Sequence, residues 1–130
     1  MSIRKSSTGA RIFLVDDNIL VLKSLSALIE SEPDLLICGL ARTARETLDS
    51  IAIANPHIAI VDISLPDASG IELIPKLLQI LPTVKILVVS MHENPFYIQP
   101  ALAAGARAFI AKKDAAHQVV PAIRELLQKK

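Results

Sequence analysis

Five polar side chains follow or close short apolar runs, at the points where strands would end. Asp16 and Asp17 follow RIFLV, Asp62 follows IAIV, Ser90 closes KILVVS, and Lys112 follows RAFIA. A single aspartate in such a place is usually a helix cap or a solvated loop residue. The joint pattern is far more specific. If the runs are parallel strands of one sheet, their carboxyl ends bring three carboxylates, a hydroxyl and an ammonium to one edge.

This set of groups favours phosphoryl chemistry. Carboxylates that lie close together raise one another's pKa, and a cation lowers it again. Oxygen ligands suit a hard ion such as Mg²⁺, which takes one or two carboxylates together with water and phosphate oxygens. A carboxylate can also attack phosphorus to give an aspartyl-phosphate. The metal, the lysine and the hydroxyl would neutralise the phosphoryl oxygens. The pattern therefore predicts Mg²⁺-dependent phosphoryl transfer onto a carboxylate.

Alternating periodicities predict the elements that position these groups. Near-continuous apolar runs, typical of strands covered on both faces, occupy Arg11–Asp16, Leu35–Leu40, Ile58–Asp62, Lys85–Ser90 and Arg107–Ala111. Helical apolar spacing occupies Ile19–Ser31, Ala44–Ala54, Ile71–Leu81, Pro95–Ala104 and Ala115–Lys129. This alternation predicts an α/β fold, a doubly wound parallel sheet with helices on both faces. We expect the flavodoxin-like strand order 2-1-3-4-5, whose switch point lies between the two strands that carry the aspartates.

Composition excludes several classes of protein. The chain has 130 residues, of which 52% are apolar and 21% charged, and its mean hydropathy is +0.46. This size corresponds to one domain, and the composition excludes intrinsic disorder. A net charge of +1 without a basic cluster argues against a stand-alone nucleic-acid binder. The single cysteine, Cys38, excludes a disulfide framework, and we expect it to pack as a small core side chain.

The sequence gives no sign of membrane insertion or export. Its apolar runs are far shorter than the roughly 20 residues that a membrane-spanning helix needs. The segment Met1–Ala10 is polar and basic, without the apolar stretch of a signal peptide. We expect a cytoplasmic protein with no membrane partner. Residues 1–10 are expected to be a flexible tail, and residues 11–130 to form the domain that carries the site.

Several motifs together resemble the receiver domain of bacterial two-component response regulators. LVDD at Leu14–Asp17 is similar to the family's acidic pair, and VDISLPDASGIEL at Val61–Leu73 to its phospho-acceptor loop. SMH at Ser90–His92, AGARAFIAK at Ala104–Lys112 and AIREL at Ala122–Leu126 are most similar to the NarL/FixJ-type branch. The resemblance extends from about Arg11 to Gln128.

The resemblance implies a role for each polar residue at the strand ends. Asp62 would accept a phosphoryl group from a sensor histidine kinase, the partner that this family implies. Asp16 and Asp17 would hold Mg²⁺ together with Asp62 and the backbone carbonyl of Ser64. Lys112 would pair with the phosphoryl group.

The resemblance also implies a switch. Ser90 would move toward a phosphorylated acceptor, and the ring of Phe109 would follow that movement. Ser64 and His92 occupy positions that tune the lifetime of the phosphoryl group in this family. Without the resemblance, Phe109 would be read as a core residue of a strand and His92 as a solvated loop residue.

Prolines depart from the helical pattern at three places, because each removes a backbone donor and crowds a carbonyl. Pro75 is tolerable if its helix begins near Ile71. Pro121 indicates that the last helix begins near Gln118 or is kinked. Pro100 lies near the middle of a short helix, which we expect to pack through apolar side chains at Phe96, Ile98 and Leu102. A further departure is Ala108, at a position that is usually glycine in this branch.

The alternatives concern the whole protein and its reaction. The branch usually carries a C-terminal DNA-binding domain, so we expect nucleic-acid contact only through an output domain missing from this chain, and a phosphorylation-dependent homodimer. A receiver-only phosphorelay protein is the alternative.

We expect no enzymatic activity beyond slow self-phosphorylation and self-dephosphorylation. An Asp-nucleophile phosphatase would need an acid or base where Ser64 stands. A flavin or nucleotide module would need a Gly-rich loop where Asp17–Leu20 stands.

Overall fold

The computed structural model describes residues 9–91 and 95–128, which form a five-stranded parallel sheet in the order β2-β1-β3-β4-β5. The strands are β1 (Ala10–Val15), β2 (Leu35–Ala41), β3 (Ile58–Val61), β4 (Lys85–Ser90) and β5 (Ala108–Ala111). The helices are α1 (Ile19–Glu30), α2 (Ala44–Ala54), α3 (Gly70–Ile80), α4 (Pro95–Ala104) and α5 (Ala115–Gln128). A 3₁₀ turn, η1 (Lys112–Asp114), connects β5 to α5. The predicted fold class and strand order are confirmed.

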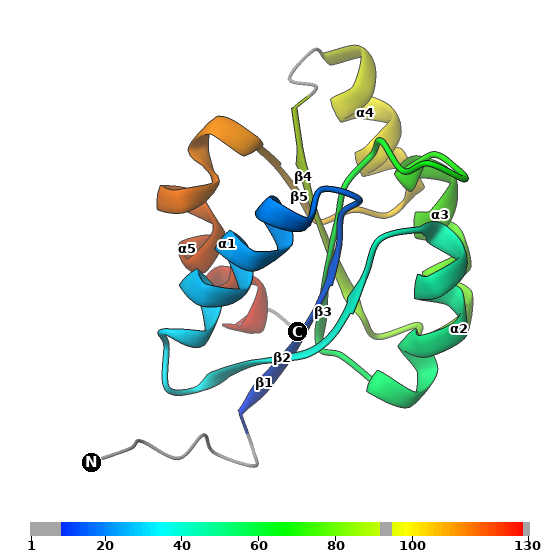
Figure 1. Cartoon of the computed structure of the whole chain (residues 1–130). Coiled ribbons are helices and arrows are strands. Elements are labelled where there is room, and N and C mark those ends of the chain that lie inside the picture. The colour runs from blue at the N-terminus through cyan, green and yellow to red at the C-terminus, as the bar shows by residue number, and fades with distance from the viewer. Residues whose placement is uncertain (1–8, 92–94, 129–130) are drawn as a thin grey trace.

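Alternation along the central strands gives the sheet two apolar faces. Ile12 and Leu14 of β1 face the core beneath α1 and α5, whereas Phe13 and Val15 face the core beneath α2, α3 and α4. Figure 1 shows the two groups of helices on opposite sides of the sheet. All four side chains are buried, because β1 lies inside the sheet and both of its faces are covered.

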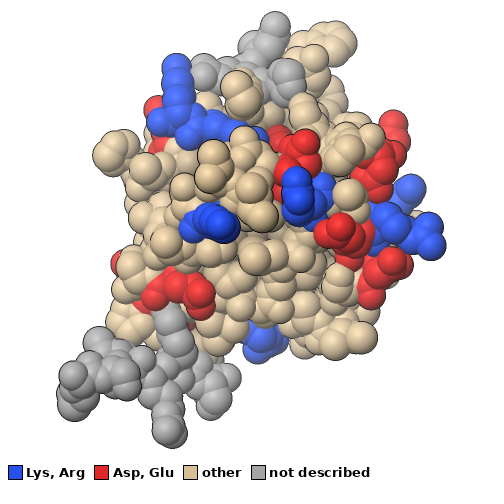
Figure 2. Space-filling view, viewed as in Figure 1, with Lys and Arg blue, Asp and Glu red and all other residues tan. Residues whose placement is uncertain are grey.

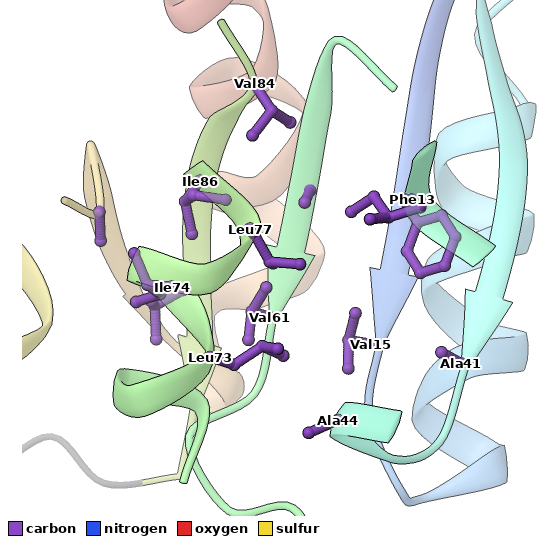
Figure 3. Packing of buried hydrophobic residues seen from close by; sticks show 14 of the residues in the cluster. Phe13, Val15, Ala41, Ala44, Val61, Leu73, Ile74, Leu77, Val84 and Ile86 are labelled. Carbon is purple, nitrogen blue, oxygen red and sulfur yellow. The ribbon is translucent and has the colours of Figure 1, made fainter. Parts of the chain in front are cut away.

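The α3 side of the core shows how a helix is fixed over the strands. Leu73, Ile74 and Leu77 recur at helical spacing and are fully buried. They pack over β3 and β4 in one cluster with Val61 and Ile86 (Figure 3). Burial of such side chains contributes roughly 1.5–3 kcal/mol each, so this contact holds α3 over the sheet and fixes the loop that precedes the helix.

Local capping determines where three helices begin. The Asn18 side chain accepts a hydrogen bond from the backbone N–H of Leu20 at the start of α1. Thr43 accepts one from Glu46 in α2, and Ser69 caps α3 in the same way. Side chains of this type are favoured caps because they satisfy the N–H groups of the first turn. α1 and α2 therefore start within a few residues of the carboxyl ends of β1 and β2, whereas a longer loop separates β3 from α3.

The helix predicted from Ala115 does begin there, so the alternative of a late start near Gln118 is wrong. Pro121 lies inside α5 and leaves the His117 carbonyl without its usual backbone donor. One predicted boundary needs correction. Ala10, which we expected in the tail, is the first residue of β1 and pairs with Leu35.

The predicted packing of α4 is wrong in two of its three residues. Phe96 is 75% exposed and Leu102 40% exposed, whereas Ala101 is fully buried. Tyr97 and Ala104 pack against the same core as Ala101. These three residues are separated by four and three positions, so their side chains lie on one face of the helix. Because that face packs against the core, Phe96 and Leu102 point toward solvent.

Cys38 is half-buried beside the core, because β2 is an edge strand, and burial raises the pKa of its thiol. Acidic and basic side chains are interspersed on the face seen in Figure 2. Among residues 9–91 and 95–128, the helices are too short or too polar to cross a bilayer.

Candidate functional site

The three aspartates meet because β1 and β3 are neighbours in the sheet. Val15 is aligned with Val61, and the Asp62 N–H donates to the Val15 carbonyl over 3.0 Å. Carboxylate oxygens of Asp16, Asp17 and Asp62 all lie within 4.8 Å of one another. Asp16 and Asp62 are buried and Asp17 is exposed. The predicted convergence of the acids at the switch point is therefore confirmed in the geometry.

Lys112 directly follows β5, the edge strand that lies beyond β4, and its side chain reaches the acids from there. β4 and β5 are paired so that Ser90 is aligned with Ala111, which places Lys112 next to the same edge. Its Nζ lies 2.9 Å from Asp16 Oδ2 and 3.2 Å from Asp62 Oδ2. Lys113, the next residue of the 3₁₀ turn, is exposed.

The site holds more negative than positive charge. Burial, and then the Asp16 carboxylate, raise the pKa of Asp62 above its usual value, against the lowering effect of Lys112. Burial alone would lower the pKa of Lys112, but the hydrogen bond to Asp16 and the charges of both carboxylates raise it overall. Lys112 therefore stays protonated, and one ammonium faces three carboxyl groups. This balance leaves room for a further cation.

The raised pKa predicts how stability depends on pH in the absence of metal. Because the pKa of Asp62 is higher in the folded than in the unfolded chain, ionisation of Asp62 opposes folding. This cost in folding free energy is fully present above the pKa that Asp62 has in the folded chain. It is lost as the pH falls toward 3.8, the ordinary pKa of the group. We expect Asp62→Asn to be more stable than the wild-type chain at about pH 7 in EDTA, by a margin that shrinks toward about pH 4. Thermal unfolding across this range measures the margin, and a pH-independent margin would contradict the assignment.

The loop after β3 is tightly closed. Ser64 and Ser69 form an isolated antiparallel bridge, and the Gly70 N–H donates to the Ile63 carbonyl over 2.7 Å. The Ser64 N–H lies 3.4 Å from Asp62 Oδ1. The loop therefore folds back on the carboxylate that it follows. That the Ser64 carbonyl is a metal ligand stays a prediction.

The structure describes three of the four residues that the resemblance assigns to the switch or to the lifetime of the phosphoryl group. Ser90 is fully buried at the end of β4, and Phe109 is half-buried on β5, aligned with Val88 and packed against the core beneath α3. Their switching roles stay predictions. Ser64 is exposed beside Asp62. His92 lies outside the described residues.

Sequence reasoning missed two residues that hold the loops of the site. The guanidinium of Arg42 donates to the Asp17 carbonyl, and the Asp67 carboxylate accepts two backbone N–H groups of α2. The motif Thr43-x-x-Glu46, a capping box, could have marked the start of α2 and therefore the place of Arg42. No local sequence pattern indicates the role of Asp67, because its hydrogen-bond partners lie more than twenty residues earlier in the chain.

Comparison with known proteins agrees with this geometry. Residues 12–124 match the response regulator receiver domain. The chain is 33% identical over 112 residues to the transcriptional regulatory protein UhpA of Salmonella typhimurium, covering 86% of this chain and 56% of that protein. A crystal structure of a LuxR-family two-component response regulator from Aurantimonas is similar, with a TM-score of 0.87, 30% identity, and 94% of this chain and 88% of that chain covered.

These matches identify the family to which the chain belongs. The chain belongs to the response regulator receiver domain family of two-component systems, and its relatives are of the NarL/LuxR type, as the sequence motifs predicted. It spans about half the length of the first curated relatives it matches. A protein-glutamate methylesterase of Nitrobacter winogradskyi is also 29% identical over 114 residues, 86% of this chain and 27% of that protein. Receivers of this family therefore occur in regulators and in at least one enzyme.

Proposed function

We propose that Asp62 is the phosphoryl acceptor of this receiver and that a sensor histidine kinase is the donor. The observation that supports this role is the cluster of three carboxylates within 4.8 Å, in which Lys112 contacts both buried members. Asp62 lies at the centre of this arrangement, since it contacts Lys112 through Oδ2 and faces the Ser64 N–H through Oδ1.

The donor set fits Mg²⁺. Its side chains offer only oxygen, and a hard cation of this kind prefers oxygen ligands. Asp16, Asp17 and Asp62 would hold the ion together with the Ser64 carbonyl. When bound, the ion would neutralise charge on the carboxylates and on the incoming phosphoryl oxygens. The burial of Asp16 and Asp62 strengthens this electrostatic effect, because their surroundings have a low dielectric constant.

The chain's own residues would divide the reaction between them. A carboxylate oxygen of Asp62 attacks phosphorus, forming a P–O bond while the P–N bond to the donor histidine breaks and its electron pair returns to the ring nitrogen. Lys112, which pairs with Asp16 and Asp62 before the reaction, can then neutralise a phosphoryl oxygen. Ser90 would hydrogen-bond another of these oxygens, and Phe109 would respond to its movement.

Mass spectrometry with a small-molecule phosphodonor tests this proposal. The intact chain should gain the mass of one phosphoryl group when Mg²⁺ is present, because the metal offsets the repulsion between the donor and the acidic cluster. Chelation with EDTA should prevent the gain. Equal labelling with and without the metal would contradict the proposed chemistry.

Two substitutions at the site should differ in their effect on Mg²⁺ binding. Asp17→Ala removes one of the few carboxylates available to the ion, so we expect weaker binding. Lys112→Ala removes a cation close to the metal site, so we expect unchanged or tighter binding. Isothermal titration of the two variants measures both effects. Weaker Mg²⁺ binding in Lys112→Ala would contradict the role of Lys112 as a partner of the phosphoryl group.

For the whole protein, we propose that phosphorylation controls an output domain. The proposal is supported by similarity to transcriptional regulatory proteins that are about twice as long as the match. In this arrangement the receiver itself contacts no nucleic acid, and phosphorylation promotes a homodimer that aligns two output domains. A receiver that acts alone in a phosphorelay is the alternative, and sequencing the reading frame beyond Lys130 decides between them.

A further inference from the structure

The amino terminus of α2 contacts the loop that follows β1. Arg42 directly precedes Thr43, the N-cap of α2, and the Arg42 N–H donates to Glu46 Oε1 over 3.0 Å. The Arg42 guanidinium donates to the Asp17 carbonyl through Nε over 3.2 Å and through Nη2 over 3.0 Å. A planar fork with two donors on one acceptor restricts orientation more than a single bond does. Arg42 therefore connects the first turn of α2, through Glu46, to the backbone of a proposed metal ligand, Asp17.

The same helix end also contacts the loop that follows β3. Asp67 Oδ1 accepts from the Ala44 N–H over 2.8 Å, and Oδ2 accepts from the Arg45 N–H over 2.9 Å. These two bonds lower the pKa of the Asp67 carboxyl, which keeps it ionised at neutral pH. A carboxylate at this position satisfies N–H groups that have no partner inside the helix, and it is favoured by the helix dipole.

The two contacts connect the loops that would supply the metal ligands. The loop after β1 carries Asp16 and Asp17, and the loop after β3 carries Asp62 and Ser64. α2 itself carries no ligand and follows the edge strand β2. A shift of the first turn of α2 would move both loops through their hydrogen bonds.

We propose that Arg42 and Asp67 are positioning residues that hold the two metal-binding loops on the first turn of α2, so that this turn sets the Mg²⁺ affinity of the site. This inference rests on the proposed function, because it assumes that the carboxylates bind Mg²⁺. Partners of metal ligands commonly change metal affinity about 10- to 100-fold when they are removed. By linkage, Mg²⁺ must also stabilise the first turn of α2.

Isothermal titration with Mg²⁺ tests the proposal on five variants. Arg42→Gln removes the fork, and Asp67→Asn keeps the shape of the side chain but turns an amide NH₂ toward one backbone N–H. Asp49→Asn and Arg45→Gln are the matched controls, since these two exposed side chains form an ion pair with each other on the same helix. Arg42→Lys restores one donor to the Asp17 carbonyl.

We expect Arg42→Gln and Asp67→Asn each to weaken Mg²⁺ binding about tenfold, Arg42→Lys to lie between Arg42→Gln and the wild type, and both controls to bind as the wild type does. Amide exchange gives a second readout. Mg²⁺ should slow exchange at the Ala44 and Arg45 amides of the wild-type chain, and this protection should be smaller in Asp67→Asn.

The possible failures are distinguishable. If the variants unfold at lower temperature but bind Mg²⁺ as tightly as the wild type, the contacts only support the fold and the inference is wrong. If a variant does not fold, Arg42→Lys and the exchange response of the wild type still decide, and an unchanged response overturns the inference. A wild-type chain that binds Mg²⁺ but takes no phosphoryl group would contradict the proposed function alone. A wild-type chain that binds no Mg²⁺ would contradict both.

Discussion

Asp62→Asn is expected to abolish phosphoryl labelling completely. The amide has nearly the same shape as the carboxylate and can still accept from the Ser64 N–H, which lies 3.4 Å from Oδ1. It has no anionic oxygen to attack phosphorus, so the P–O bond cannot form. Because ionisation of Asp62 opposes folding, the substitution should not destabilise the chain. Intact-mass measurement after donor treatment, together with a thermal unfolding curve, separates loss of chemistry from loss of fold.

Asp49→Asn is the control for this experiment. Asp49 is an exposed aspartate on α2 that pairs only with Arg45 among the described contacts, so this variant should be labelled as the wild-type chain is. Neutral hydroxylamine adds a chemical test, since it attacks the carbonyl carbon of an acyl-phosphate and releases phosphate. Labelling of Asp62→Asn, or a label that resists hydroxylamine, would place the phosphoryl group on another residue.

Gly70→Ala is expected to destabilise the chain strongly, although alanine is the better helix former. A Cβ at Gly70 would lie 2.1 Å from the Asp62 carbonyl oxygen and 2.9 Å from the Ile63 Cα. Both are backbone atoms, so the loop that follows β3 would have to move. Overpacking of this kind typically costs about 1–3 kcal/mol, occasionally more. We expect a loss of about 3 kcal/mol, with weaker Mg²⁺ binding because the displaced backbone carries Asp62.

Denaturant unfolding of Gly70→Ala measures this cost, and Ala52→Gly provides the scale for helix propensity. Ala52 is exposed within α2, so Ala52→Gly should lose about 1 kcal/mol from propensity alone. If close packing against Asp62 determines the need for glycine, both variants lose stability and Gly70→Ala loses more. A Gly70→Ala chain as stable as the wild type would show that the loop can shift without cost.

The sequence predicted the sheet well because its central strands are covered on both faces. β1, β3 and β4 are near-continuous apolar runs, and the acids follow two of them directly. Parallel pairing then brings Asp16 and Asp62 together without any local signal. The central part of the site was therefore predictable from strand order and from the residues just beyond the strand ends.

Other features depend on tertiary packing that periodicity does not encode. The first turn of α2 receives Asp67 from a loop far along the chain, and only the folded sheet makes them neighbours. In α4, the small side chain of Ala101 fits closest to the core, so the larger apolar residues Phe96 and Leu102 face solvent. Hydrophobicity alone ranks these residues in the opposite order.

The central claim is that Asp62 carries the phosphoryl group inside a Mg²⁺ site built by its neighbours. A crystal structure of the chain with Mg²⁺ and beryllofluoride, a phosphoryl mimic, tests it most directly. The account predicts beryllium bonded to an Asp62 carboxylate oxygen, Mg²⁺ bound by Asp16, Asp17 and Asp62, and Lys112 turned toward a fluorine atom. Beryllofluoride on another residue, or a metal ion bound away from Asp62, would contradict the account.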